Sequence, residues 1–151
     1  MSGVRRVGAE AASVLAQVHA QGFERGWSSG EIAALLDQPG VIGLAVGDPA
    51  AGFILIRTVV DEAEILTLAV DPARRGQGLG GALTDAALEL ARAEGVASIF
   101  LEVAADNTAA IRIYERLAFT NSGVRRGYYS RANNSSVDAL ILTCDLNSRE
   151  T

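Results

Sequence analysis

The sequence predicts an α/β fold of the α+β kind, in which helices flank a mixed, mostly antiparallel sheet with one central parallel pair of strands. Three observations predict it. Two helical patterns lie in residues 10–38, three strand-like runs with short turns lie in residues 41–70, and strands then alternate with helices. Short turns join antiparallel neighbours, whereas a helix between two strands joins a parallel pair.

The first forty residues predict a short strand and two helices. The strand covers residues 4–7, and an alanine-rich helix follows over residues 10–21. Three apolar residues mark the buried face of that helix: Val14, Leu15 and Val18. Ser28 or Ser29 can cap the second helix, which Pro39-Gly40 ends.

The middle of the chain predicts an antiparallel meander. Its strands cover residues 41–46, 52–60 and 64–70, and the turns between them are Gly47-Asp48-Pro49 and Asp61-Glu62. A glycine-rich turn follows. The remaining elements are a helix over 82–94, a strand over 98–103, a helix that starts at 106–108, and strands over 124–130 and 139–144.

Length and composition predict a single domain, residues 1–151, in the cytoplasm. Hydrophobic residues make up 49% of the chain and charged residues 21%, which is enough apolar material for a packed core. No apolar run approaches the roughly 20 residues of a membrane-spanning helix, and residues 1–12 lack the apolar stretch of a signal peptide. We therefore expect no membrane association.

The scarcity of cysteine and histidine excludes several kinds of site. Cys144 and His19 are the only residues of their types, so we expect no internal disulfide, no metal site and no nucleophile–histidine motif. Both are interpreted as structural residues. The net charge of −5 argues against nucleic-acid binding and is compatible with a basic peptide as partner.

The glycine-rich turn, Arg74–Gly81, has the composition of an anion-binding loop. Its four glycines let the backbone approach a ligand closely, and the helix after it adds the positive end of its dipole. Arg74 and Arg75 can pair with phosphate oxygens. The alternative is a helix-initiating turn with solvent-exposed arginines.

A dinucleotide-binding fold is a rival interpretation of this turn. Gly76–Gly81 fits G-x-G-x-x-G, and Glu102 lies about 20 residues beyond it, where that fold has its ribose-binding acid. Two features oppose it. Asp71–Arg75 separates the strand from the glycines, and the antiparallel meander leaves too few residues for two mononucleotide-binding halves. The absence of G-x-x-x-x-G-K-[ST] excludes a P-loop kinase.

The motifs resemble one known superfamily. Arg75-Gly76-Gln77-Gly78-Leu79-Gly80 is similar to the [RQ]-x-x-G-x-[GA] signature of the GNAT superfamily of N-acetyltransferases. Further stretches resemble its RimI branch, from about His19 to Leu142: Leu101-Glu102-Val103, Asn107, Tyr114–Phe119, Arg125–Tyr129 and Asp138-Ala139. Two departures are Ala104-Ala105-Asp106, which replaces an arginine-containing sequence, and Ala118, which replaces glycine.

This resemblance implies a GNAT-like three-layer fold and an N-acetyltransferase with acetyl-CoA as co-substrate and no metal. The glycine-rich amides would hold the pyrophosphate, and the preceding strand would pair with the pantetheine arm. The residues implied in acetyl-CoA binding are Leu68, Ala69, Val70, Arg75, Gly76, Gln77, Gly78, Leu79, Gly80, Gly81 and Asn107.

The same resemblance implies that Glu102 and Tyr114 are catalytic. Glu102 would take a proton from the acceptor amine, and Tyr114 would protonate the departing thiolate. From the residues alone, Glu102 can equally be an exposed carboxylate on an edge strand, and Tyr114 an amphipathic residue between helix and sheet. Asn107 can simply cap its helix.

The acceptor implied by the RimI branch is a protein N-terminal α-amine, that of the N-terminal alanine of a ribosomal protein. Because the reaction needs no covalent enzyme intermediate, we expect direct transfer in a ternary complex. Trp27, Tyr128, Tyr129 and Glu24 would line the acceptor groove, although the aromatics can equally be core residues. Alternatives are a small amine or lysine as acceptor, a non-catalytic acetyl-CoA-binding module, and a nicotinamide oxidoreductase. We expect a monomer or a weak dimer.

Overall fold

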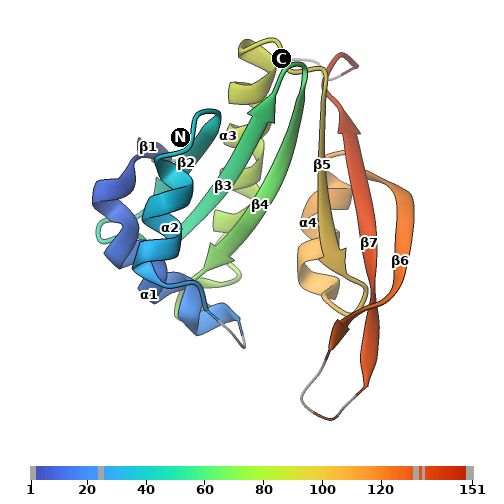
Figure 1. The fold of residues 1–151 in the computed structure, drawn as a ribbon, viewed down its shortest axis with the longest axis horizontal. Helices are drawn as coiled ribbons and strands as arrows, with labels where there is room; N and C mark the ends of the chain where they lie inside the picture. The colour runs from blue at the N-terminus through green and yellow to red at the C-terminus, as the bar shows by residue number, and fades with distance from the viewer. Residues whose placement is uncertain (1–2, 24–25, 131–132, 134, 149–151) are drawn as a thin grey trace.

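The computed structural model describes residues 3–23, 26–130, 133 and 135–148, and within them seven strands form one sheet (Figure 1). The strands are β1 (Arg5–Val7), β2 (Val41–Val46), β3 (Gly52–Val59), β4 (Glu62–Val70), β5 (Ser98–Ala104), β6 (Thr120–Ser130) and β7 (Ser136–Asp145). The helices are α1 (Ala12–Gly22), α2 (Ser29–Leu36), α3 (Leu79–Ala93) and α4 (Thr108–Arg116). Short 3-10 helices, Ala9–Ala11 and Pro72–Arg74, precede α1 and the glycine-rich turn.

The order of strands across the sheet is β1-β2-β3-β4-β5-β7-β6. All neighbours are antiparallel except β4 and β5, which are parallel. Helix α3 connects this parallel pair, as expected for a crossover. The predicted fold class is therefore confirmed.

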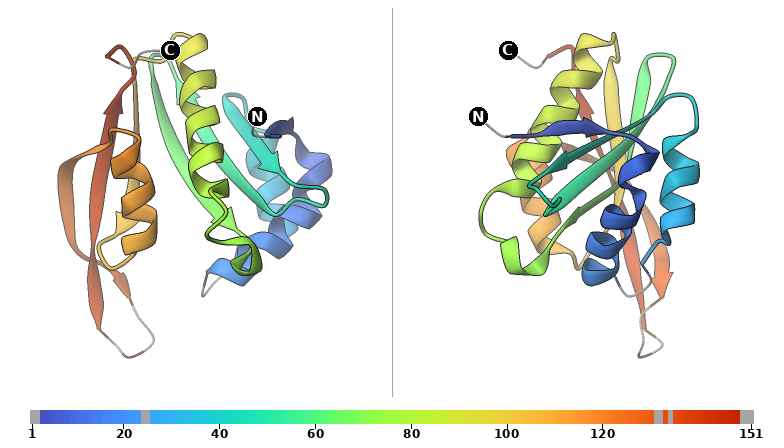
Figure 2. Two further views of the ribbon diagram at one scale, coloured as in Figure 1. Left: turned by 180° about the vertical axis from the view of Figure 1, so that it is seen from behind. Right: turned by 90° about the vertical axis from the view of Figure 1, so that its left-hand side faces the viewer.

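Helices cover both faces of the sheet, so the fold has three layers (Figure 2). Helices α1 and α2 pack on one face in a cluster that contains Leu15 and Phe53. Helices α3 and α4 pack on the other face in a larger cluster that contains Leu83 and Ile54. Adjacent residues of β3 thus serve opposite cores, as the pleat requires. Among the described residues, no helix has both the length and the apolar character needed to cross a membrane.

The buried face of α1 differs from the predicted one. Leu15 and Val18 are buried as predicted, but Val14 is 36% exposed, while His19 is only 1% exposed. Since a helix turns once in 3.6 residues, Leu15, Val18 and His19 form one stripe and Val14 lies beside it. The prediction for Val14 was wrong because the apolar pattern gave no weight to a polar residue in the core.

The local sequence determines where helices α2 and α3 begin. Ser28 caps α2 in a reciprocal capping box: its Oγ accepts the Glu31 N–H at 3.1 Å, and Oε1 of Glu31 accepts the Ser28 N–H at 3.0 Å. Helix α3 begins at Leu79 rather than at the predicted Ala82, because Gly78 is already its left-handed N-cap. The end of the glycine-rich sequence is therefore the first turn of a helix.

Candidate active site

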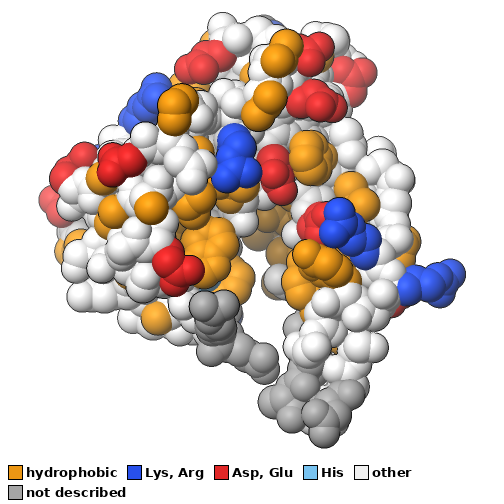
Figure 3. Space-filling view, viewed as in Figure 1, with side chains coloured by type: hydrophobic (Ala, Val, Ile, Leu, Met, Phe, Trp, Pro, Cys, Tyr) orange, Lys and Arg blue, Asp and Glu red, His pale blue; other side chains and the backbone are white. Residues whose placement is uncertain are grey.

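The neighbouring strands β4 and β5 separate soon after they meet. They pair only from Glu62 with Ser98 to Glu64 with Phe100, and beyond that point they diverge (Figure 1). The surface is hollowed between the half that carries β4 and the half that carries β5 (Figure 3). The rest of both strands therefore borders a gap in the sheet, called here the strand gap.

The backbone of β4 offers hydrogen-bond donors to the strand gap. The Asp71 N–H donates to the carbonyl oxygen of Ala51, beside β3, at 2.7 Å. Successive amides of a strand point to alternate edges. The amides of Leu68 and Val70 therefore point into the strand gap, whereas that of Ala69 points to β3.

A β-bulge lies in β4 just before these residues. Leu55 pairs with Thr67 and Ile56 pairs with Ile65, so Leu66 is the extra residue on β4. Leu66 packs in the α1–α2 cluster, and the side chain of Thr67 meets His19 of α1, so both residues project to the same face. Because a bulge bends its strand and increases its twist, it favours the divergence of β4 from β5.

The glycine-rich turn leaves open space for a ligand. Gly76 and Gly78 have φ values of 80° and 79°, a conformation that glycine adopts without strain. A Cβ added to Gly76, Gly78 or Gly81 would meet no atom within 4 Å. The first N–H groups of α3, as of any α-helix, have no intrahelical partner, and no side chain caps them. The turn therefore fits a phosphate-bearing ligand.

The polar side chains of this turn have different roles. Nε of Arg74 donates to Oε1 of Gln77 at 3.0 Å, which braces the turn from within. Arg75 is exposed, and its side chain makes no hydrogen bond or ion pair in the part of the chain that the structure describes, so its guanidinium is available to an anion. Gly80 is buried, and a Cβ there would lie 2.9 Å from Cδ1 of Ile113, so it lets α3 and α4 approach closely.

Glu102 lies on β5 beyond the last residue that pairs with β4. Leu101 and Val103 belong to the α3–α4 core, so alternation turns Glu102 to the opposite face, on the side of α1 and α2. Its side chain is 23% exposed, and its Oε1 lies 3.2 Å from Nη2 of Arg125. The candidate base is thus beside the strand gap, partly buried, and paired with a cation.

Arg125 belongs to an irregular part of β6. Arg125 pairs with Ala139 and Tyr129 with Val137, so three residues, 126–128, lie opposite Asp138 alone. Gly127 has a φ of 62°, and its N–H donates to Oδ1 of Asp138 at 2.8 Å. We call this segment the β6 bulge.

The aromatic residues next to the bulge lie beside the cation. Cζ of Arg125 lies 5.1 Å from the centroid of the Tyr128 ring, which in turn meets Tyr129 edge to face at 5.2 Å. Tyr128 is 53% exposed. Glu102, Arg125 and Tyr128 therefore form one continuous group on the sheet.

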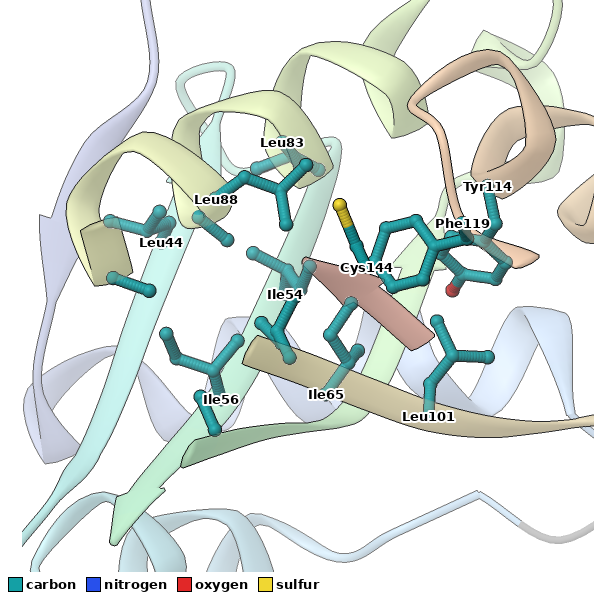
Figure 4. Close-up of a cluster of buried hydrophobic side chains, with 14 of the residues drawn as sticks. Leu44, Ile54, Ile56, Ile65, Leu83, Leu88, Leu101, Tyr114, Phe119 and Cys144 are labelled. Carbon is teal, nitrogen blue, oxygen red and sulfur yellow. The ribbon is translucent and has the colours of Figure 1, made fainter. Parts of the chain in front are cut away.

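Tyr114 lies on the other face of β5. It is 5% exposed, and its ring lies 5.4 Å from that of Phe119, over β5 and next to Leu101 (Figure 4). Burial raises the pKa of the Tyr114 phenol above its ordinary value of 10.0, so the hydroxyl keeps its proton at neutral pH. A buried, protonated phenol is a proton donor, and here it stands across β5 from the Glu102 carboxylate.

Asn107 performs the structural role that its sequence position allows. It is the N-cap of α4, and its Oδ1 accepts the Ala110 N–H at 3.2 Å. The cap uses only the Oδ1 atom of the Asn107 side-chain amide, and Nδ2 takes no part in it.

Trp27 lines a cleft of about 520 Å³ on the face that α1 and α2 cover. The other residues around this cleft come from α2, from the end of that helix and from β4: Glu31, Ala34, Leu35, Gln38, Glu64 and Leu66. Glu24, which was predicted to line the same groove, lies outside the described residues. The structure therefore gives two groups of predicted acceptor residues, Trp27 at this cleft and Tyr128 with Tyr129 beside Arg125.

Residues 13–119 match the profile of the Acetyltransferase (GNAT) family. The chain belongs to this family. The superfamily resemblance of the glycine-rich turn is thereby confirmed, and the dinucleotide-binding interpretation was wrong. A G-x-G-x-x-G pattern alone does not distinguish the two folds, since both place a glycine turn before a helix.

Relatives of known name point to one branch of the family. The [ribosomal protein bS18]-alanine N-acetyltransferase of Escherichia coli K12 is 41% identical over 92 residues, which cover 61% of this chain and 62% of that protein. The crystal structure of the ribosomal-protein-S18-alanine N-acetyltransferase from Escherichia coli superposes with a TM-score of 0.89 at 28% identity, covering 99% of this chain and 97% of that one. Arabidopsis thaliana NAA60 in complex with acetyl-CoA shares the fold, with a TM-score of 0.82 at 21% identity over 96% of this chain and 98% of that one.

No function in the site was assigned from the sequence to three residues that the structure places next to predicted site residues: Arg125, Asp138 and His19. A glycine inside a strand, Gly127, signals a bulge, but no sequence signal identifies Asp138 as the acceptor of its amide. A histidine four residues after Leu15 lies on the same helical stripe. No sequence signal pairs Arg125 with Glu102, because their contact depends on the register of β5, β7 and β6.

Proposed function

We propose that this protein is an acetyl-CoA-dependent N-acetyltransferase of the RimI kind, whose acceptor is the N-terminal α-amine of a protein, namely the N-terminal alanine of a ribosomal protein. The observation that carries the proposal is the position of Glu102 and Tyr114 on opposite faces of β5 beside the strand gap. The identity of the Escherichia coli relative supports the choice of acceptor.

Acetyl-CoA would bind on the face of α3 and α4. The amides of residues 76–81 and the guanidinium of Arg75 would hold its pyrophosphate, and the amides of Leu68 and Val70 would hold the pantetheine arm and the thioester oxygen. Asn107 would contribute its Nδ2 amide to the pantetheine arm while its oxygen caps α4. The turn fits this ligand because it is open where a Cβ would otherwise stand.

The acceptor would approach from the face of α1 and α2, toward Glu102. The Glu102 carboxylate takes a proton from the α-ammonium group, directly or through a water, because only the neutral amine is a nucleophile. The amine then attacks the thioester carbon, and the carbon–sulfur bond breaks. Tyr114 donates its phenolic proton to the leaving sulfur, and the second proton that the nitrogen loses as the amide forms passes to solvent, from which the phenol is reprotonated. Since the two reactants meet in the strand gap from opposite faces, the transfer is direct.

The test is thiol release from acetyl-CoA with a peptide that starts Ala-Arg, compared with the same peptide N-acetylated and with an N-blocked peptide that contains lysine. Release with the free N-terminus alone is expected. Thiol release only with the lysine peptide would contradict the proposed acceptor. Thiol release with none of the three peptides would contradict the proposal that the protein acetylates polypeptides.

A further inference from the structure

His19 is the only histidine of the chain, and both of its ring nitrogens have partners. Nδ1 lies 3.1 Å from the backbone nitrogen of Trp27, which donates its hydrogen to it. Nε2 lies 3.2 Å from Oγ1 of Thr67 in β4. A single buried ring thus joins α1, the start of the α2 segment and the bulged part of β4.

These contacts fix the protonation state of the ring. Nδ1 accepts a hydrogen bond from a backbone amide, so it carries no hydrogen. The neutral ring then has its hydrogen on Nε2, which donates to the Thr67 hydroxyl. A second proton would have to bind at Nδ1, where it would face the Trp27 N–H and break that hydrogen bond.

Packing on both sides of the ring strengthens the link to Trp27. The ring of His19 stacks on that of Phe23 at 4.0 Å between centroids and on that of Trp27 at 4.7 Å. A Cβ added to Gly26 would lie 2.7 Å from Cα of Ala20. Residues 26 and 27 are therefore held directly against α1, with no space for a larger residue at 26.

The link matters because it joins two walls of one cleft. Trp27 and Leu66 both line the cleft of about 520 Å³, and Leu66 is the neighbour of Thr67 in the bulge. The next residue, Leu68, presents its amide to the strand gap. The position of the ring therefore sets the distance between Trp27 and the part of β4 that borders the reaction site.

We propose that His19 is a positioning residue that holds Trp27 against β4 to form the acceptor-binding cleft, and that the cleft loosens when the imidazole takes up a second proton. This proposal rests on the proposed function for the identity of the acceptor. Its structural part, the coupling of the ring to Trp27, does not depend on catalysis.

Burial and the charges around the His19 ring determine the pH at which the imidazole takes up its second proton. Burial lowers the pKa of His19 below its ordinary value of 6.5, and Glu31 of α2, which caps its own helix, opposes that effect. Glu64 of β4 lines the same cleft. Apart from His19 itself, α1 has no ionisable side chain, and the residue of β3 that faces the ring is the apolar Phe53. The ring is therefore neutral at neutral pH, and the coupling is lost only on the acid side of 6.5.

The experiment measures the affinity of a fluorescently labelled Ala-Arg peptide, by anisotropy, and its KM, from about pH 5.5 to 8.5, across the titration of an ordinary imidazole. His19→Asn is the diagnostic variant, because its Oδ1 can accept the Trp27 N–H in place of Nδ1 but does not titrate. In the unmodified protein, Kd and KM should rise about fivefold or more at acid pH relative to His19→Asn, as the loss of one hydrogen bond predicts. The kcat ratio of the two proteins should stay constant.

Two glycine variants provide a matched pair that does not alter the imidazole. Gly26→Ala should raise the peptide Kd at every pH, because the new Cβ must push residue 26 off α1. Gly30→Ala should leave it unchanged, because the nearest atom to a Cβ there is Oγ of Ser28 at 3.8 Å.

Emission from the chain's only tryptophan, Trp27, reports the coupling without any acceptor. It should titrate with a midpoint below 6.5 in the unmodified protein and stay flat in His19→Asn. A flat emission in both, or a peptide affinity with the same pH dependence in both, would overturn the positioning role. Coupled emission and peptide affinity without thiol release would keep that role and refute the proposed acetyl transfer.

Discussion

The carboxylate of Glu102 and the guanidinium of Arg125 lie 3.2 Å apart, with Arg125 half exposed to solvent. The cation stands on the face from which an acceptor amine would approach the same carboxylate. An incoming α-ammonium group must therefore compete with Arg125 for Glu102.

Replacement of Arg125 by alanine should remove that competition. A solvated ion pair contributes about 0.2–1 kcal/mol, so KM for the acceptor peptide should fall by about 1.5- to 5-fold, with little change in kcat. Steady-state kinetics at low and high salt would measure this, since salt screens the pair in the unmodified protein only. Arg126→Ala serves as the control, and a raised KM for Arg125→Ala would show that the arginine binds the acceptor instead.

Glu102→Gln keeps the shape of the side chain and removes its basicity. We expect kcat to fall by about 10²–10⁴-fold, the usual range for a general base. Acetyl-CoA should still raise the melting temperature of the variant, because Glu102 lies on the acceptor face. If turnover stays within a few-fold of the unmodified protein, another group takes the proton.

Tyr114→Phe should lower kcat while leaving the packing against Phe119 in place. It should also change the stability at alkaline pH. Because burial raises the pKa of Tyr114 in the folded state, the unfolded chain loses this proton first, and the protein loses stability as the pH rises above 10. At pH 10.5 this effect amounts to about 0.8 kcal/mol, which the phenylalanine variant should not show in urea unfolding. An equal loss of stability in both proteins would contradict the assignment.

Two glycine-to-alanine replacements in the glycine-rich turn should change the free energy of unfolding in opposite directions. Gly78→Ala places a Cβ on a left-handed N-cap and should lower the free energy of unfolding by about 1–2 kcal/mol. Gly81→Ala, in the first turn of α3, should not lower it and should raise it by up to about 1 kcal/mol. Acetyl-CoA should nevertheless stabilise Gly81→Ala less than the unmodified protein, since the added Cβ occupies the open space of the turn. An undiminished rise in melting temperature would place the ligand elsewhere.

The capping box of α2 should be measurable by itself. Ser28→Ala removes the acceptor for the Glu31 N–H, and the expected cost is about 1 kcal/mol in the free energy of unfolding. Ser29→Ala, one residue later and without a cap bond, should have little effect. Chemical denaturation of the two variants compares them directly, and equal costs would mean that the box contributes nothing.

The order of elements could be predicted from the sequence because each one has a local signal. Turn residues separate β2, β3 and β4. Ser28 followed by Glu31 predicts the start of α2, and Gly95 predicts the end of α3. The start of α3 could not be placed as well, since a run of glycines is typical of a turn and the helix continues into it. The bulge at Leu66 also has no signal, because it exists only relative to β3.

The candidate site could be predicted in part for the same reason. Residues in one contiguous motif, such as Gly76 to Gly81, lie together whatever the fold does elsewhere. Contacts across the sheet, such as Glu102 with Arg125, depend on strand register and on the extra residues of the β6 bulge. The roles of Glu102, Tyr114 and Asn107 in chemistry stay predictions, as do the cytoplasmic location and the oligomeric state.

The β6 bulge also affects the outer edge of the sheet. Strand β6 is an outer strand, and its ladder with β7 is regular only over 120–121, 123–125 and 129–130. At the opposite border of the sheet, β1 has three residues. Short edge strands and bulges hinder pairing with another chain, so both borders of the described sheet are poor templates for it. The irregular segment that carries Arg125 thus also interrupts the aligned backbone amides that another strand would need for pairing.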